Sequence, residues 1–163
     1  MLVHKIKKDW GKYVIKTCEG KSDCFVCATT GVPSVALDCD ALKADAAFNS
    51  IKARHGKSSD CLLIEHDSVM QVAVIEFKSN WSDGAGATRQ LLAGCQIAKT
   101  LLSGYKPKKE YKIYLIVSAN RHPEVVRKKF FHEIKTSGES IERVITAGCH
   151  EQFKSLRNRK RDA

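Results

Sequence analysis

The chain has 163 residues, 43% of them hydrophobic, and carries a formal net charge of +10 at pH 7. This length predicts a single domain over residues 1–163 with a sizeable core, and no internal repeat is evident. The N-terminus is polar and charged, and the apolar runs are far too short to span a bilayer. A secretory signal and a membrane span are therefore not expected, and no membrane is expected among the partners.

Seven cysteines are spread along the chain, and an odd number in a lysine-rich sequence is not typical of a secreted disulfide framework. Cys61, Cys95 and Cys149 fall within apolar runs and are expected to act as small core residues. We therefore expect a soluble protein in a reducing, intracellular compartment, namely the cytoplasm, the nucleoid or the nucleus.

The first predicted elements are two short β-type runs at residues 12–17 and 24–29, joined by a polar turn. They indicate a hairpin within an N-terminal β-ribbon extension, residues 1–39. Residues 40–55 then have helical composition with an imperfect apolar stripe.

A central hairpin follows, with apolar runs at residues 61–64 and 69–77 separated by the turn-like residues 66–68. The remaining predicted elements are a helix at 85–102, a strand at 111–118, a helix at 123–135, a strand at 141–146 and a weak C-terminal helix. This order predicts an α/β sandwich in which residues 40–150 form a core with a central mixed sheet flanked by helices.

Charged residues gather at one end of the central hairpin. If the turn is centred near Ser68, Asp60 lies opposite Glu76, within one residue of register. Directly opposed side chains share a face roughly 5 Å apart at Cβ, and the period of two puts Lys78 on the Glu76 face. An acid-x-lysine triplet is more often a solvated strand end, but this one closes a run that is apolar on both faces, which indicates burial.

Two buried carboxylates side by side raise each other's pKa, so a positive group is needed between them. A hard cation, Mg²⁺ or Mn²⁺, suits such a pair, and the protein ligands would be Asp60, Glu76 and the carbonyl of Phe77. Lys78 would stand beside the metal, where it could hold the attacking water and stabilise charge on phosphoryl oxygens.

These residues resemble the motif of the PD-(D/E)xK, or restriction-endonuclease-like, nuclease superfamily: Asp60, then Glu76-Phe77-Lys78 on the adjacent strand. The resemblance covers roughly two thirds of the chain and implies an αβββαβ core with the catalytic residues on the central hairpin. Many members carry a glutamine in the next helix facing the active site, and Gln90 occupies the matching place. The alternative for Gln90 is an ordinary exposed helix residue.

The sequence departs from the family pattern at two places. Ser59 stands where the family name has proline. Many members also place a metal-binding glutamate in the first helix, and the helix predicted at residues 40–55 contains none. Asp45 is the nearest substitute as a metal ligand, because Asp38 and Asp40 are better placed as N-caps.

The positive charge is concentrated in the C-terminal part of the chain. Lys plus Arg against Asp plus Glu number 6 and 4 in residues 1–39, 7 and 7 in 40–103, and 15 and 7 in 104–163. The candidate phosphate contacts are Lys106, Lys108, Lys109, Arg127, Lys128, Lys129, Arg157, Arg159, Lys160 and Arg161. The alternative is a set of solvated faces and, for residues 151–163, a disordered basic C-terminal tail.

Four thiols lie within a short segment beside the first predicted helix. Their spacing is Cys18-x5-Cys24-x2-Cys27-x11-Cys39, which is not a clean pair of C-x2-C knuckles. A structural Zn²⁺ site is one interpretation, and unligated cysteines are the other.

These observations predict a Mg²⁺- or Mn²⁺-dependent nuclease that hydrolyses phosphodiester bonds. DNA is favoured over RNA as the substrate, and an endonuclease is the expected type. The incomplete set of acids leaves a second hypothesis, a catalytically inactive nucleic-acid-binding protein on the same fold. A third is a protein-interaction module whose basic regions meet an acidic partner. A homodimer is compatible with the sequence.

Overall fold

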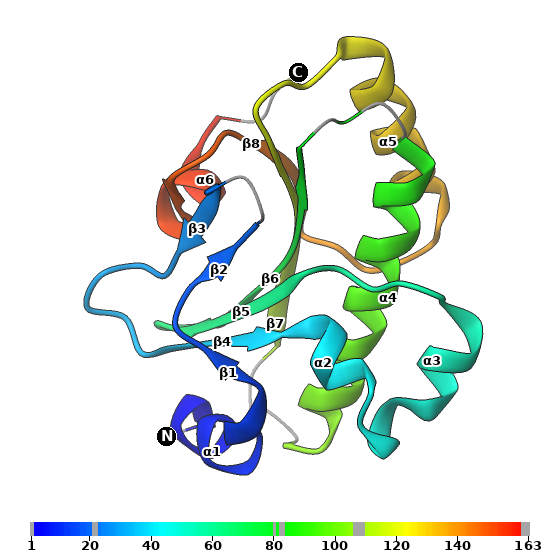
Figure 1. Cartoon of the computed structure of the whole chain (residues 1–163). Helices are drawn as coiled ribbons and strands as arrows, with labels where there is room; N and C mark the ends of the chain where they lie inside the picture. The colour runs from blue at the N-terminus through cyan, green and yellow to red at the C-terminus, as the bar shows by residue number, and fades with distance from the viewer. Residues whose placement is uncertain (1, 21–22, 80, 82–83, 106–109, 161–163) are drawn as a thin grey trace.

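The fold is built on a six-stranded mixed sheet, seen edge-on near the centre of the computed structural model (Figure 1). The structure describes residues 2–20, 23–79, 81, 84–105 and 110–160. In spatial order the strands are β1 (Val14–Ile15), β4 (Ser34–Asp38), β5 (Cys61–His66), β6 (Met70–Lys78), β7 (Tyr111–Ala119) and β8 (Arg143–Ala147). Pairing is antiparallel from β1 to β6 and parallel from β6 to β8.

Helices pack on one face of this sheet (Figure 1). They are α1 (Leu2–Asp9), α2 (Cys39–Lys43), α3 (Asn49–Arg54), α4 (Gly84–Ser103) and α5 (Glu124–Thr136), with short 3-10 turns η1 (Gly11–Tyr13) and η2 (Ala46–Phe48). Helix α4 crosses the sheet very closely at Gly94, where an added Cβ would lie 2.1 Å from Ser59 Oγ and 2.5 Å from Val74 Cγ1. Only glycine permits this approach, which packs the middle of α4 directly against Ser59 and the middle of β6.

The other face is covered by a small sheet and the last helix. The small sheet has the order β2 (Cys18–Glu19), β3 (Phe25–Cys27) and β9 (Glu151–Gln152), and α6 (Phe153–Asn158) follows directly. Alternate residues of the central strands, such as Leu63 and Ile75, pack there against Phe153 and Leu156. The molecule is therefore a three-layer sandwich around the central sheet.

The predicted α/β sandwich with a mixed sheet is confirmed, and so are its strongest elements. β5 and β6 form the central hairpin, with His66 paired to Met70 and Cys61 to Ile75. If this pairing is continued by one residue, Asp60 lies opposite Glu76. This is the register expected for a turn centred near Ser68. The helix at 85–102 and the strand at 111–118 are α4 and β7, each within one residue of its predicted bounds.

The expected N-terminal hairpin of runs 12–17 and 24–29 is not formed, because β1 pairs with β4 while β3 pairs with β2. Four elements, α1, β2, β4 and β9, were not predicted, and one helix was predicted too long. Helix α1 has only two buried residues, and β4 is a five-residue strand, so both give weak patterns. The expected helix at 40–55 divides into α2, η2 and α3, because the Asp45 side chain accepts a hydrogen bond from Ala47 N and begins a new turn. Apart from the short strands β1–β3 and the helical segment α2–η2–α3 between β4 and β5, the elements α1, β4, β5, β6, α4 and β7 follow one another in the order αβββαβ. The segment 40–55 therefore lies inside this series, and α1 opens it.

The segment after residue 150 is not a disordered tail as far as residue 160. β9 pairs in parallel with β3, and Phe153 and Leu156 of α6 are fully buried. The many basic residues of this segment favoured a tail, although Phe153 and Leu156 are spaced as on one face of a helix.

Four of the seven cysteines form two disulfides, Cys18–Cys61 and Cys24–Cys149. Disulfides persist mainly in oxidising environments, so these pairs weigh against the expected reducing compartment. Cys61 and Cys149 are thus not simple core residues, whereas Cys95 is buried and free. No helix in the described part of the chain is long and apolar enough to cross a membrane.

Candidate functional site

Asp60 and Glu76 lie side by side where the central hairpin opens. Asp60 immediately precedes β5, and its Oδ2 accepts a hydrogen bond of 2.7 Å from the backbone N–H of Phe77, the residue after Glu76. Its own carbonyl accepts a hydrogen bond of 3.1 Å from Cys39 N at the start of α2. The acid is therefore fixed between β6 and α2.

Lys78 and Gln90 complete this group. Lys78 Nζ lies 2.8 Å from Glu76 Oε1 and donates a hydrogen bond of 2.6 Å to Gln90 Oε1. Gln90 Nε2 in turn donates to the carbonyl of Ser58 at 3.4 Å. The structure thus brings together all four residues that the motif singled out, on the helix-covered face of the sheet. Gln90 is an anchored residue and not an ordinary exposed one.

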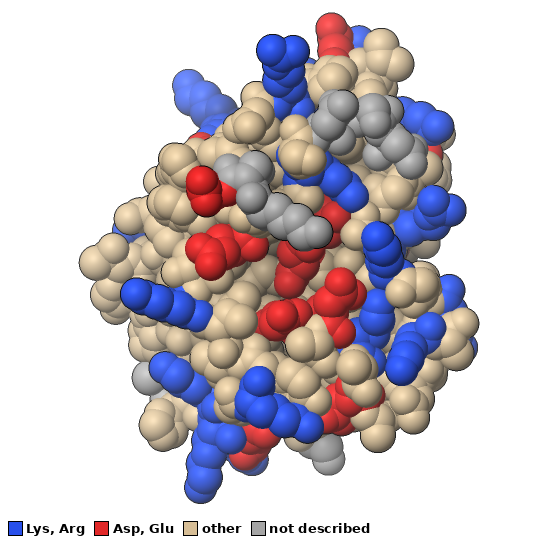
Figure 2. All heavy atoms as spheres, viewed as in Figure 1, with Lys and Arg blue, Asp and Glu red and all other residues tan. Residues whose placement is uncertain are grey.

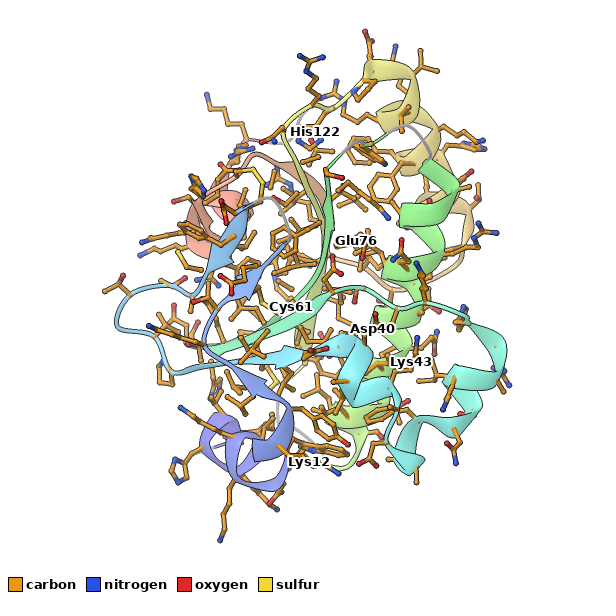
Figure 3. All side chains as sticks on the ribbon, viewed as in Figure 1. Lys12, Asp40, Lys43, Cys61, Glu76 and His122 are labelled. Carbon is orange, nitrogen blue, oxygen red and sulfur yellow. A yellow bond between two sulfur atoms is a disulfide. The ribbon has the colours of Figure 1, made fainter. Side chains whose placement is uncertain are left out.

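A third acid, Asp40, stands beside the pair. It is the second residue of α2 and accepts hydrogen bonds from Ser58 Oγ at 2.8 Å and Lys43 Nζ at 3.2 Å. Asp40 and Asp60 line one pocket, and Figure 3 shows Asp40 and Glu76 on the same side of the sheet, toward α4. The sequence analysis assigned Asp40 only a capping role. In the structure Asp38 is the N-cap of α2, since it accepts a hydrogen bond of 2.9 Å from Ala41 N. A helix has one N-cap, so the sequence already indicated that either Asp38 or Asp40 was free for another role.

Asp45 does not belong to this group, which corrects its prediction as a metal ligand. Its carboxylate accepts a hydrogen bond of 2.6 Å from the Tyr13 hydroxyl, pairs with Lys12 at 3.2 Å and caps η2. These contacts lower the pKa of Asp45 to about 2, the Tyr13 hydrogen bond contributing most. Lys12 lies near α1, away from Glu76 (Figure 3). The helix break at residue 45 turns this side chain toward the N-terminal segment.

The acids open onto a pocket of about 550 Å³ between the β-ribbon and α2. It is lined by Ile15, Lys16, Thr17, Glu19, Asp38, Asp40, Asp60 and Cys61. Figure 2 shows red acidic side chains gathered in the middle of this face, with blue basic ones around them. Glu76 does not line the pocket and is only 2% exposed, so it lies behind Asp60.

Electrostatics favour a cation at this position. Burial, with the charges of Asp60 and Asp40 in addition, raises the pKa of Glu76 to about 7, although Lys78 opposes this. Burial also raises the pKa of Asp60, against the Phe77 N–H and Lys78. Glu76 Oε2 is buried and has no hydrogen-bond partner. An orphaned carboxylate oxygen beside a second acid is the local chemistry that a divalent cation satisfies.

The side chains alone do not form a complete metal cage. Among the described residues, no three His, Cys, Asp or Glu side chains are grouped closely enough to hold a metal ion. Mg²⁺ needs no such cage, because it is usually bound by one or two carboxylates together with water and substrate phosphate. The Phe77 carbonyl as a further ligand stays a prediction.

The cysteine cluster predicted for zinc is not assembled. Cys18 and Cys24 are used in disulfides with distant partners. The Cys39 thiol is fully buried and accepts a hydrogen bond from Ser59 Oγ, and Cys27 contacts the carbonyl of Glu151. The four sulfurs are therefore engaged at separate places, and the structure does not bring them together as a zinc site.

The predicted phosphate contacts have different surroundings. Arg157 is wrong as a surface contact: its side chain is 9% exposed, 4.0 Å from the buried Glu65 and stacked on Phe153. Arg159 pairs with Glu151, while Arg127 and Lys160 stay partly or fully exposed. On α5, Lys128 and Lys129 form exposed pairs with glutamates one turn away. The other four predicted contacts, Lys106, Lys108, Lys109 and Arg161, lie outside the described residues.

Comparisons with protein-family models, with curated proteins and with solved structures found no match to this chain. The resemblance to PD-(D/E)xK nucleases therefore rests on the motif and on the order of elements alone.

Proposed function

We propose that this protein is a metal-dependent nuclease that hydrolyses phosphodiester bonds of DNA. The observation that supports the proposal most directly is the buried Glu76, with one oxygen unpartnered, beside Asp60 and held against Lys78. Two carboxylates and a lysine at one sheet end are the groups that this reaction needs.

The residues of this group take different roles in the proposed reaction. Asp60 and Glu76 would hold Mg²⁺ or Mn²⁺, and the nearby charge of Asp40 would add to the attraction for the cation. The cation would neutralise the carboxylates and stabilise negative charge on the phosphoryl oxygens. Lys78 contacts Glu76 and Gln90. Its ammonium would hold the attacking water and offset charge in the transition state. Gln90 positions Lys78.

A nucleic-acid substrate is supported by the net charge of +10, because a cationic surface attracts a polyanion without sequence preference. The basic side chains around the acidic pocket would meet phosphates on either side of the scissile bond (Figure 2). An intracellular location and a homodimer stay part of the proposal, although the disulfides favour an oxidising compartment.

Cleavage by the purified protein tests this function. Circular, linear, single-stranded and branched DNA, together with RNA, should be incubated with Mg²⁺, with Mn²⁺ and with EDTA. We expect DNA cleavage in either metal and none in EDTA, and opening of circles would identify an endonuclease. Salt-sensitive binding without cleavage in any divalent metal would contradict the proposal and favour the catalytically inactive DNA-binding protein.

Asp40 and Asp45 provide a matched pair of variants. Asp40→Asn should raise the Mg²⁺ concentration needed for half-maximal cleavage about tenfold, because it removes a charge beside Asp60 and Glu76. Asp45→Asn should leave this concentration unchanged, since asparagine still caps η2 and Asp45 faces Tyr13. Metal titrations of both variants provide the measurement, and the reverse result would restore Asp45 as the ligand.

A further inference from the structure

A second cavity, of about 420 Å³, opens between the end of α3 and the first turns of α4. Its walls include Arg54, His55, Gly56, Lys57, Arg89 and Gln90. We refer to it as the cationic pocket. Figure 2 shows blue basic side chains on this side of the molecule, over the region where Figure 1 places α3.

No acid in the described part of the chain pairs with the three cations of the cationic pocket. Arg54, Lys57 and Arg89 are exposed, and within the described ranges none of them has a carboxylate at ion-pair distance. Lys78, by comparison, has such a partner. Three like charges around one cavity repel one another, so an anion entering it would be attracted by all three.

The cationic pocket adjoins the candidate active site through shared residues. Gln90 lines it and accepts the hydrogen bond from Lys78. The loop before β5 forms part of its wall, where Lys43 Nζ donates to the Gly56 carbonyl at 3.0 Å while also contacting Asp40. A ligand in this pocket would therefore lie beside residues that contact Lys78 and Asp40.

We propose that the cationic pocket binds a phosphate group of the DNA strand, next to the phosphate that is cleaved. This rests on the proposed function and adds a subsite to it. Arginine presents a planar fork of donors that matches phosphate oxygens, and the pocket has two. Its described lining contains no Phe, Tyr or Trp on which a base could stack, which indicates recognition of phosphate rather than of a base.

Binding measured in EDTA tests the pocket separately from cleavage. Fluorescence anisotropy with a short single-stranded DNA should show that Arg54→Ala, Lys57→Ala and Arg89→Ala each weaken binding about tenfold, as expected for a lost charge-assisted contact. Lys52→Ala is the matched control. This exposed lysine lies on α3, as Arg54 does, but it does not line the pocket. It should weaken binding about twofold at most.

Equal effects of all four substitutions would contradict the proposed phosphate site, because general surface charge alone would then explain the loss of affinity. If the pocket variants lose affinity as expected but the wild type cleaves no DNA, the pocket is retained and the proposed function fails. If the wild type cleaves and the pocket variants match Lys52→Ala, the nuclease is retained and the pocket fails.

Strands with a 5′-phosphate, a 3′-phosphate or only hydroxyl ends distinguish two sources of the bound phosphate. A terminal phosphate would give a preference for one phosphorylated end that Arg89→Ala removes. An internal phosphate would give equal affinities for all three strands, each lowered by Arg89→Ala. Either pattern supports the pocket, whereas affinities that Arg89→Ala leaves unchanged on all three strands contradict it.

Discussion

Glu76→Gln and Lys78→Met should each lower the rate of Mg²⁺-dependent DNA cleavage by about a thousandfold. Glutamine keeps the shape of Glu76 but removes the negative charge that would hold the cation. Methionine keeps the length of Lys78 but removes the ammonium that lies 2.8 Å from Glu76 and 2.6 Å from Gln90. Single-turnover cleavage at saturating Mg²⁺ provides the measurement, and circular dichroism checks that each variant is folded.

Lys112→Met is the matched control for this experiment. Lys112 is also a strand lysine paired with a glutamate, Glu142 at 3.1 Å, but it lies on β7 and its side chain is 44% exposed. Its loss should leave cleavage within about twofold of the wild-type rate, as for most surface pairs. Wild-type rates for Glu76→Gln and Lys78→Met would show that the hairpin end is not the active site.

The core of the candidate site could be predicted because it is local in sequence. Asp60, Glu76 and Lys78 belong to one hairpin, whose apolar runs are long and whose turn leaves little freedom of register. Gln90 follows within the next helix, and the resemblance supplied its position. The short sequence separation and the strong periodicity of the hairpin therefore made these positions predictable.

The rest of the site depends on contacts between distant segments, which no local pattern encodes. Whether Asp40 or Asp45 joins Asp60 is decided by where α2 ends and by the hydrogen bond from Ser58 to Asp40. The pairing of Cys24 with Cys149 spans 125 residues. Arg157 likewise reads as a surface residue, and only the tertiary fold places it against Glu65.

Glu76 also gives the wild-type protein an expected pH dependence of stability. Its pKa is about 7 in the folded protein, against an ordinary value of 4.5. Between these pH values the folded state keeps a proton that the unfolded chain has lost, so the free energy of unfolding falls as pH rises. The loss should total about 3 kcal/mol and be complete above pH 7. Urea denaturation at pH values from about 5 to about 8 measures it, above the range in which Asp45 titrates.

Glu76→Gln should remove most of this loss, because glutamine does not ionise. The inactive variant is then expected to be more stable than the wild type at about pH 8. Mg²⁺ should stabilise the wild type at that pH and leave Glu76→Gln nearly unchanged, since a ligand that binds only the folded state adds to its stability. Glu142→Gln, at an exposed position, should keep the wild-type profile. A wild type whose stability is flat from pH 5 to 8 without metal would mean that Glu76 ionises freely and that no cation is needed there.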